Sequence, residues 1–253
     1  MIPEEKLDWR RTEKPTASKS NWLITDSEVR FNQNKANRHK YHLLKNLGYL
    51  DTNAIVYDLD DDGFRRPLEY GEKKFLALGC SYTYGIGLAA NEIWPNLLGE
   101  TANATIFNGS QPGASTDTAF RLLKVLLKRE APEAVFHLVT HPNRREIIFP
   151  ELRGNYPWAY GPWDFGKESL RSYTEIVTNE HSSAIHQEKN LLAMAHLCHL
   201  AEIPYIEIIF ENTVHLRRDN TDTGRDLGHP GKRFHRALAD EMYRKYRNLS
   251  KTA

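Results

Sequence analysis

The sequence predicts an α/β protein whose parallel sheet carries helices on both faces. From residue 73 onward, short apolar runs alternate with amphipathic helical segments, an order typical of parallel sheets. The 253 residues are enough for one α/β domain with extensions and a sizeable core. Aromatic residues make up 11% of the chain, which argues against disorder.

The part of the chain before residue 73 lacks this alternation. Residues 1–20 are charged and carry Ser, Thr and Pro without periodicity, so we expect an arm that lies on the surface or on a second chain. Residues 21–72 are expected to be an extension that packs on the core, with a short helix near Lys35–Leu47 and a strand at Ala54–Tyr57. The main domain is expected to cover residues 73–253.

Four short apolar runs in the main domain are expected to form the strands of the sheet. They are Phe75–Leu78, Thr105–Phe107, Ala134–Val139 and Tyr205–Phe210. The segments between and after them have helical spacing of apolar residues. The expected helices are Ala90–Glu100, one that begins at a Ser115 or Thr116 cap, Ser183–Leu200 and Lys232–Leu249.

Charge and composition exclude several classes of protein. Lys and Arg number 34 against 33 Asp and Glu, a net charge of +1 that does not favour capture of nucleic acid or of an acidic membrane. No apolar run of about 18 residues is present, so no membrane span is expected. The N-terminus lacks the apolar stretch of a signal peptide, and Cys80 and Cys198 are expected to be reduced thiols in a cytoplasmic protein.

Three polar segments fall where open α/β sheets hold their sites, at the carboxyl ends of strands. Ser81 follows the first strand and Gly79, so its hydroxyl can stand at the sheet edge as a nucleophile. Gly113 precedes a helix start, where its N–H can bind an anion. Asp226 lies three residues before His229, so its carboxylate can hold one ring nitrogen while the other faces a nucleophile.

These segments resemble the motif blocks of the SGNH/GDSL hydrolase family. Gly79-Cys80-Ser81-Tyr82-Thr83 is similar to the first block, G-D-S-x-T, with Cys in place of Asp. Gly113 matches the glycine of the second block, and Asp226-x-x-His229 matches the last block. The resemblance implies a three-layer α/β/α sandwich with a mostly parallel, flavodoxin-like sheet.

The resemblance also implies acyl transfer without a metal or organic cofactor. Ser81 would be the nucleophile, His229 the general base and then the general acid, and Asp226 the residue that orients His229. The backbone N–H groups of Ser81 and Gly113 would bind the oxyanion.

The third block of the family, usually G-x-N-D, is the weakest match. Asn143 is the Asn nearest to that position and stands two or three residues late. Two alternatives follow: a longer loop lets the Asn143 amide join the oxyanion hole, or Thr140 or Arg144 takes its place.

An aromatic loop at 150–165 is expected to overhang the cleft, where flat rings can stack on a sugar or pack an acyl chain. The alternative is a loop that packs onto the core or onto another subunit, with Arg144 and Arg145 in ion pairs to Glu146 or Glu151 rather than to a substrate anion. The candidate substrate contacts are Tyr82, Arg144, Trp158, Tyr160 and Trp163.

Other patterns are interpreted as structural. Asp58–Gly63 followed by Glu69 has the spacing of a calcium loop, but strand-like residues precede it, so a hairpin turn is expected. Gly85–Ala90 fits G-x-G-x-x-A but lies several residues beyond the strand end. His196 and His199 lack the further ligands of a zinc site, so no metal is expected.

The function expected from the resemblance is hydrolysis of a small or carbohydrate-linked acyl ester through an acyl-serine intermediate. Two alternatives stay open: an acyltransferase that uses the same triad, and a non-catalytic module that binds a glycan or a protein partner. The arm at 1–20 suggests a homo-oligomer.

Overall fold

The computed structural model describes residues 18–148, 157–216 and 221–249 and confirms the α/β class. The strands of its main sheet are β3 (Lys73–Leu78), β4 (Ala104–Asn108), β5 (Ala134–Val139) and β8 (Tyr205–Ile209). They are all parallel, in the order β4-β3-β5-β8. The apolar runs predicted β5 at both ends and the other three strands to within two residues.

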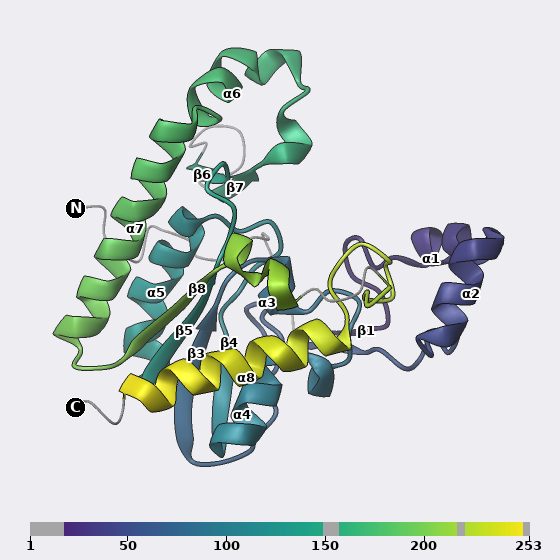
Figure 1. The fold of residues 1–253 in the computed structure, drawn as a ribbon, viewed down its shortest axis with the longest axis horizontal. Coiled ribbons are helices and arrows are strands. Elements are labelled where there is room, and N and C mark those ends of the chain that lie inside the picture. Colours follow the sequence, from purple (N-terminus) through teal and green to yellow (C-terminus); the bar gives the residue numbers. More distant parts are fainter. Residues whose placement is uncertain (1–17, 149–156, 217–220, 250–253) are drawn as a thin grey trace.

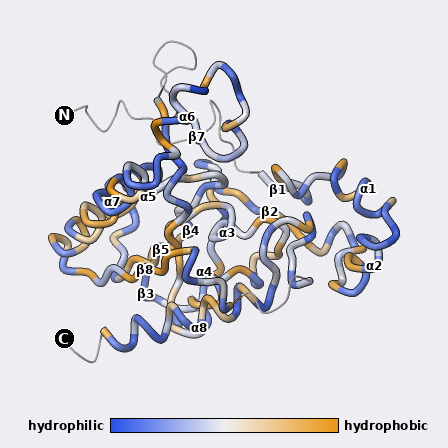
Figure 2. Tube along the Cα trace, turned by 45° about the horizontal axis from the view of Figure 1, so that its top comes forward, coloured by the Kyte–Doolittle hydropathy of each residue, from blue (hydrophilic) through white to orange (hydrophobic). Residues whose placement is uncertain are grey.

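Helices cover both faces of this sheet, which gives three layers (Figure 1). The helices α4 (Trp94–Ala102) and α8 (Lys232–Leu249) share one apolar cluster with the sheet. The helices α5 (Thr116–Glu130) and α7 (Glu180–Leu200) share a second cluster on the opposite face. Figure 2 shows the apolar residues along the central strands, as burial on both faces requires.

Side-chain caps explain where the helices begin. Ser115 Oγ accepts the N–H of Thr118 at 3.3 Å and starts α5, as predicted. Asn179 Oδ1 accepts the N–H of Ser182 at 3.1 Å and starts α7, three residues before the predicted start.

The structure has two helices in this part of the chain, of which the second matches the helix predicted near Lys35–Leu47 and the first was not predicted. They are α1 (Glu28–Ala36) and α2 (Arg38–Asn46). Asn37 ends the first and caps the second, since its Oδ1 accepts the N–H of Lys40 at 3.1 Å. This cap explains why the second helix begins at Arg38 rather than at Lys35.

The predicted strand at Ala54–Tyr57 is also displaced. The structure has β2 (Tyr57–Leu59), which pairs antiparallel with β1 (Ser18–Ser20). Beyond it, Asp60 Oδ1 accepts the N–H groups of Asp62 and Phe64 at 3.0 and 2.9 Å. Leu59 then bridges to Arg65, so the segment with calcium-loop spacing forms the predicted hairpin turn.

The segment before the main sheet shares its apolar core with the residues that follow Ser81. In that cluster, Phe31, Leu44 and Tyr57 pack with residues such as Tyr84 and Ile93, and all five are buried. Residues 18–72 therefore lie directly against the loop beyond β3.

The aromatic loop is partly a hairpin. The structure has β6 (Arg145–Ile148) paired antiparallel with β7 (Pro157–Tyr160), so the prediction of an irregular loop is wrong for 157–160, and residues 149–156 lie outside the described ones. The remaining short elements are η2 (Ala90–Glu92), η3 (Pro162–Asp164), η4 (Glu168–Leu170), α6 (Arg171–Val177) and η5 (Phe210–Leu216).

A buried histidine in α8 is expected to make the fold acid-sensitive. His235 Nδ1 accepts the N–H of Trp94 at 3.0 Å, so this nitrogen carries no proton. Burial, and then the charges of Arg65 and His229, lower the pKa of His235 from 6.5 to about 3. Stability that is present above pH 6.5 is therefore lost as the pH falls toward 3.

We expect a His235→Asn variant, whose amide oxygen can still accept the Trp94 N–H, to have a shallower pH dependence. Between pH 7 and 4.5, the wild type should lose about 2 kcal/mol more unfolding free energy than this variant. Urea unfolding at both pH values measures the difference, with the exposed His196→Asn as the matched control. Equal losses in all three proteins would contradict the role of His235.

Candidate active site

Ser81 is the first residue of the short helix α3 (Ser81–Tyr84), directly beyond the carboxyl end of β3. It is 8% exposed. The turn before it needs glycine, because Gly79 has φ +152° and a Cβ there would lie 2.2 Å from Thr83 Oγ1. The spacing of Gly79, Ser81 and Thr83 is thus explained by one tight strand-to-helix turn that presents the serine at the sheet edge.

Two side chains that the sequence analysis missed hold the end of α3. The Arg65 guanidinium is buried and donates to the carbonyl oxygens of Gly85 at 2.9 Å and Leu88 at 3.1 Å. Asn108, the last residue of β4, donates its amide to the Thr83 carbonyl at 3.0 Å. The bonds to Thr83 and Gly85 satisfy carbonyl groups that a short helix leaves open at its end. These contacts have no local sequence signal, because the carbonyl groups of Gly85, Leu88 and Thr83 lie 20 or more residues from the side chains that bind them.

The loop that carries Gly113 lies against the Ser81 turn. The N–H of Gly109 donates to the Ala77 carbonyl at 2.9 Å, and that of Gln111 donates to the Gly79 carbonyl at 3.3 Å. Gly113 itself has φ +76°, a conformation that glycine adopts readily. The first two motif segments are therefore adjacent at the same edge of the sheet.

The expected contact between Asp226 and His229 is present. Asp226 Oδ2 lies 2.7 Å from His229 Nδ1, and Asp226 Oδ1 accepts the backbone N–H groups of Gly228 and His229 at 3.1 and 3.0 Å. Burial raises the pKa of Asp226, but the hydrogen bond and charge of His229 and the two N–H groups outweigh it and hold this pKa at about 2. The carboxylate is thus ionised at neutral pH and can stabilise a charged imidazole.

Tyr82 connects the serine turn to the histidine loop. Its ring lies perpendicular to that of His229, with centroids 5.4 Å apart, and packs on Phe210 at 4.7 Å. Nearby, the N–H of Arg225 donates to the Gly87 carbonyl at 2.9 Å. The residue after Ser81 therefore touches the candidate base, which places the first and last motif segments side by side.

The described hydrogen bonds of the His229 ring go to Asp226 alone. Within the described residues, the Ser81 hydroxyl forms no hydrogen bond with the His229 ring. Apo enzymes often tighten such bonds only when substrate is bound.

The structure does not bring the Asn143 amide to the Ser81 turn through any contact in the described residues. Its backbone N–H donates to His141 Nδ1 at 3.3 Å in an exposed turn. Thr140 is buried, and its carbonyl accepts the amide of Gln187 at 2.7 Å. The oxyanion role of Asn143 stays a prediction.

The two adjacent arginines have different surroundings. Arg145 is buried and donates to the Pro142 carbonyl at 2.5 Å, while Glu146 pairs with Arg121 at 2.6 Å. The alternative of an ion pair with Glu146 is therefore not formed, and Glu151 lies outside the described residues. Arg144 lies over the Trp163 ring at 5.4 Å, and its Nε and Nη1 atoms are buried without hydrogen-bond partners. Of the pair, Arg144 is the one that can still bind an anion.

The three aromatic residues predicted to contact substrate are not equivalent. Tyr160 is fully buried and its hydroxyl lies 2.5 Å from Thr174 Oγ1, so this ring packs between its loop and α6 instead of facing a cleft. Trp158 is partly buried, with Lys167 Nζ over its ring at 5.5 Å. Trp163 is 50% exposed and presents its ring to solvent.

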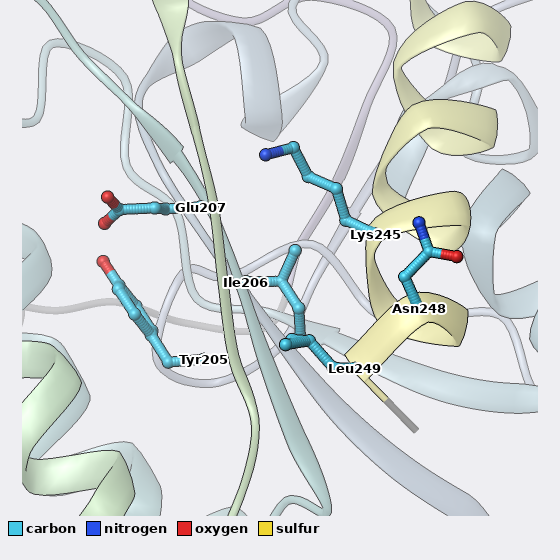
Figure 3. Close-up of a pocket in the computed structure, with 6 residues that line it drawn as sticks. All are labelled: Tyr205, Ile206, Glu207, Lys245, Asn248 and Leu249. Atoms are coloured by element: carbon cyan, nitrogen blue, oxygen red, sulfur yellow. The ribbon is translucent and has the colours of Figure 1, made fainter. Parts of the chain in front are cut away.

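A groove of about 470 Å³ lies elsewhere, between the amino end of β8 and the last turn of α8 (Figure 3). Residues of β8 line it on one side, with Ile206 directed toward the helix, and Lys245, Asn248 and Leu249 of α8 line it on the other. Parallel strands place Ser81 at their opposite, carboxyl ends, so this groove is distinct from the candidate site.

The described residues contain neither a metal-ligating cluster nor a membrane-spanning helix. No group of three or more metal-ligating side chains converges in these ranges. Within the same ranges, no helix combines the length and the apolar character needed to cross a bilayer.

Comparison with known proteins gives matches in structure alone. No protein-family model and no curated protein matches the chain. The psychrotrophic esterase EstA from Pseudoalteromonas sp. is 16% identical with a TM-score of 0.40, over 71% of this chain and 100% of that one. A G-D-S-L family structure from Desulfitobacterium hafniense is 13% identical with a TM-score of 0.37, over 68% and 99%.

The acetyl xylan esterase Est2A from Butyrivibrio proteoclasticus is 12% identical with a TM-score of 0.41, over 76% of this chain and 68% of that one. The structural matches thus include esterase and GDSL-type structures and cover most of this chain, at low identity and low TM-score. At these scores the matches say nothing about the chemistry of the site, which has to be inferred from its own residues.

Proposed function

We propose that the protein is a serine esterase that hydrolyses an acyl or O-acetyl ester through an acyl-serine intermediate. The observation that carries the proposal is the buried, ionised Asp226 at 2.7 Å from His229 Nδ1, on a loop that touches the Ser81 turn through Tyr82. A carboxylate on Nδ1 leaves Nε2 free to accept a proton from a serine hydroxyl.

In the proposed reaction, His229 Nε2 takes the proton of Ser81 Oγ while Oγ attacks the ester carbonyl carbon. The resulting oxyanion accepts the backbone N–H groups of Ser81 and Gly113, with the Asn143 amide as the third donor. One such donor is worth about 3–4 kcal/mol of transition-state stabilisation. Collapse expels the alcohol, which takes the proton from His229, and water then releases the acid by the same steps.

The proposed substrate has a carbohydrate or other flat polar part next to its acyl group. The half-exposed ring of Trp163, with Arg144 beside it, is the surface on which we expect that part to stack. We also propose a cytoplasmic location, because Cys80 and Cys198 are free, buried thiols.

Fluorophosphonate labelling tests the nucleophile directly. We expect one covalent adduct, located on Ser81 by mass spectrometry, because only an activated serine attacks the phosphorus at a useful rate. The Ser81→Ala variant should stay unlabelled, and His229→Gln should be labelled far more slowly. An adduct on another residue, or none, would reject Ser81 as the nucleophile.

A panel of acyl esters and acetylated sugars identifies the activity. Release of free acid supports the esterase, whereas acyl transfer to an added alcohol without free acid supports an acyltransferase. Binding of a panel member without turnover, equal in wild type and Ser81→Ala, would instead indicate a non-catalytic module.

A further inference from the structure

A residue from the N-terminal part of the chain binds the carboxylate of Asp226. Thr25 Oγ1 donates to Asp226 Oδ2 at 2.9 Å, across 201 residues of sequence. The same oxygen lies 2.7 Å from His229 Nδ1, and Oδ1 accepts two backbone N–H groups. An ionised carboxylate has about four acceptor positions, so these bonds fill it, and Thr25 supplies the bond that comes from outside its own loop.

A buried ion pair holds Thr25 in place. Its neighbour Asp26 binds Arg225, the neighbour of Asp226, through Nε–Oδ1 at 2.9 Å and Nη2–Oδ2 at 2.8 Å. Both side chains of this pair are 1% exposed or less. Two consecutive residues thus contact two consecutive residues of the histidine loop. Thr25 binds Asp226, and Asp26 binds Arg225.

The backbone of the Thr25 turn is held from both sides. Leu23 and Asp26 exchange backbone hydrogen bonds at 2.8 and 3.0 Å. Between them Ile24 has φ +52°, a left-handed conformation that is costly for a β-branched residue, and its side chain is 57% exposed. The backbone of the turn is therefore strained at Ile24 in the conformation that directs Thr25 toward Asp226.

We propose that Thr25 is a positioning residue of the active site, which fixes the Asp226 carboxylate so that His229 presents Nε2 to Ser81. It touches neither substrate nor Ser81 and acts through Asp226. The inference rests on the proposed function for its catalytic effect, whereas its effect on His229 can be measured without turnover.

Removal of the Thr25 hydroxyl would change how the charge of the Asp226 carboxylate is shared among its donors. Asp226 Oδ2 would keep His229 as its remaining donor, so more of its negative charge would stabilise the imidazolium, and the pKa of His229 would rise. The other charged or titratable groups that face this pair include Tyr82, whose ring packs on His229, and the Asp26–Arg225 ion pair. Arg30 of α1, whose Nη2 lies 3.0 Å from a Cβ placed on Gly228, and His235 of α8 are also near.

The test compares Thr25→Val, which keeps the side-chain shape, with Thr25→Ser, which keeps the hydroxyl. With p-nitrophenyl acetate and the full chain, Thr25→Val should lower kcat about ten-fold with little change in KM, because Asp226 loses a charge-assisted hydrogen bond that positions it against His229. The acid limb of the kcat–pH profile of Thr25→Val should move to higher pH. Thr25→Ser should stay within about two-fold of the wild type.

The control is Ser27→Ala in the same segment. Ser27 Oγ accepts the N–H of Arg30 at 3.2 Å and caps α1, so this variant weakens the segment without touching Asp226. It should leave kcat and the pH profile unchanged. If Thr25→Val does not fold, Thr25→Ala replaces it in the same comparison.

NMR titration of the His229 imidazole, assigned with His229→Gln, separates this inference from the proposed function. An upward shift of its pKa in Thr25→Val and not in Thr25→Ser supports the inference even if no ester is hydrolysed. An unchanged titration together with an unchanged kcat overturns it, as does a Thr25→Ser variant that behaves like Thr25→Val. Activity that survives in Ser81→Ala would reject the esterase alone.

Discussion

Replacement of Ser81 by alanine is expected to lower kcat/KM for ester hydrolysis by about 10⁴-fold or more, because the nucleophile and its acyl intermediate are lost. KM should change little, since the hydroxyl forms no contact that holds the ground state. The measurement is the initial rate of p-nitrophenyl acetate hydrolysis by purified protein, with thermal unfolding to show that the variant folds. The exposed Ser182→Ala is the matched control and should keep full activity.

The same experiment with His229 tests whether the two residues act as a unit. His229→Ala should cost about as much as Ser81→Ala, and the double variant should cost no more than either single one. Losses that add on a logarithmic scale would show that Ser81 and His229 act independently, which the proposed proton transfer does not allow.

Loss of the Arg225 side chain is expected to destabilise the fold by about 3–5 kcal/mol, because it leaves the Asp26 carboxylate buried without its counter-charge. Arg225 is fully buried, lies over the Trp22 ring at 4.1 Å and donates to the Thr52 carbonyl at 3.0 Å. Urea unfolding of Arg225→Met measures the loss.

Two comparisons make this prediction specific. The double variant Arg225→Met with Asp26→Asn should recover part of the stability, because it no longer buries an unpaired charge. Arg236→Ala removes an exposed ion pair with Glu100 and should change the unfolding free energy by about 0.5 kcal/mol or less. A similar small change for Arg225→Met would contradict the structural role of the buried pair.

Local patterns predicted the sheet and its helices well. Buried parallel strands are short apolar runs, and caps such as Ser115 lie next to the helices that they start. The contact between Asp226 and His229 was also predictable, since three residues of spacing bring them together. By contrast, β7 was missed because its Pro, Trp and Tyr composition has no alternating pattern.

The support of the site could not be predicted in this way. Thr25, Arg65 and Asn108 each bind a partner 20 or more residues away, and each is a common residue type without a local signature. The burial of Tyr160 depends on α6, which packs around it only in the folded chain. Polar residues whose partners are distant in sequence can be assigned only once the fold is known.

The bond between Thr25 and Asp226 also bears on how the protein folds. It joins residues 201 positions apart, and closing a flexible loop of that length has an entropic cost on the order of 5 kcal/mol. The central strands can pair through much shorter connections, so we expect this junction to form late. A chain that has collapsed but not yet closed it would possess its sheet and still lack a completed active site.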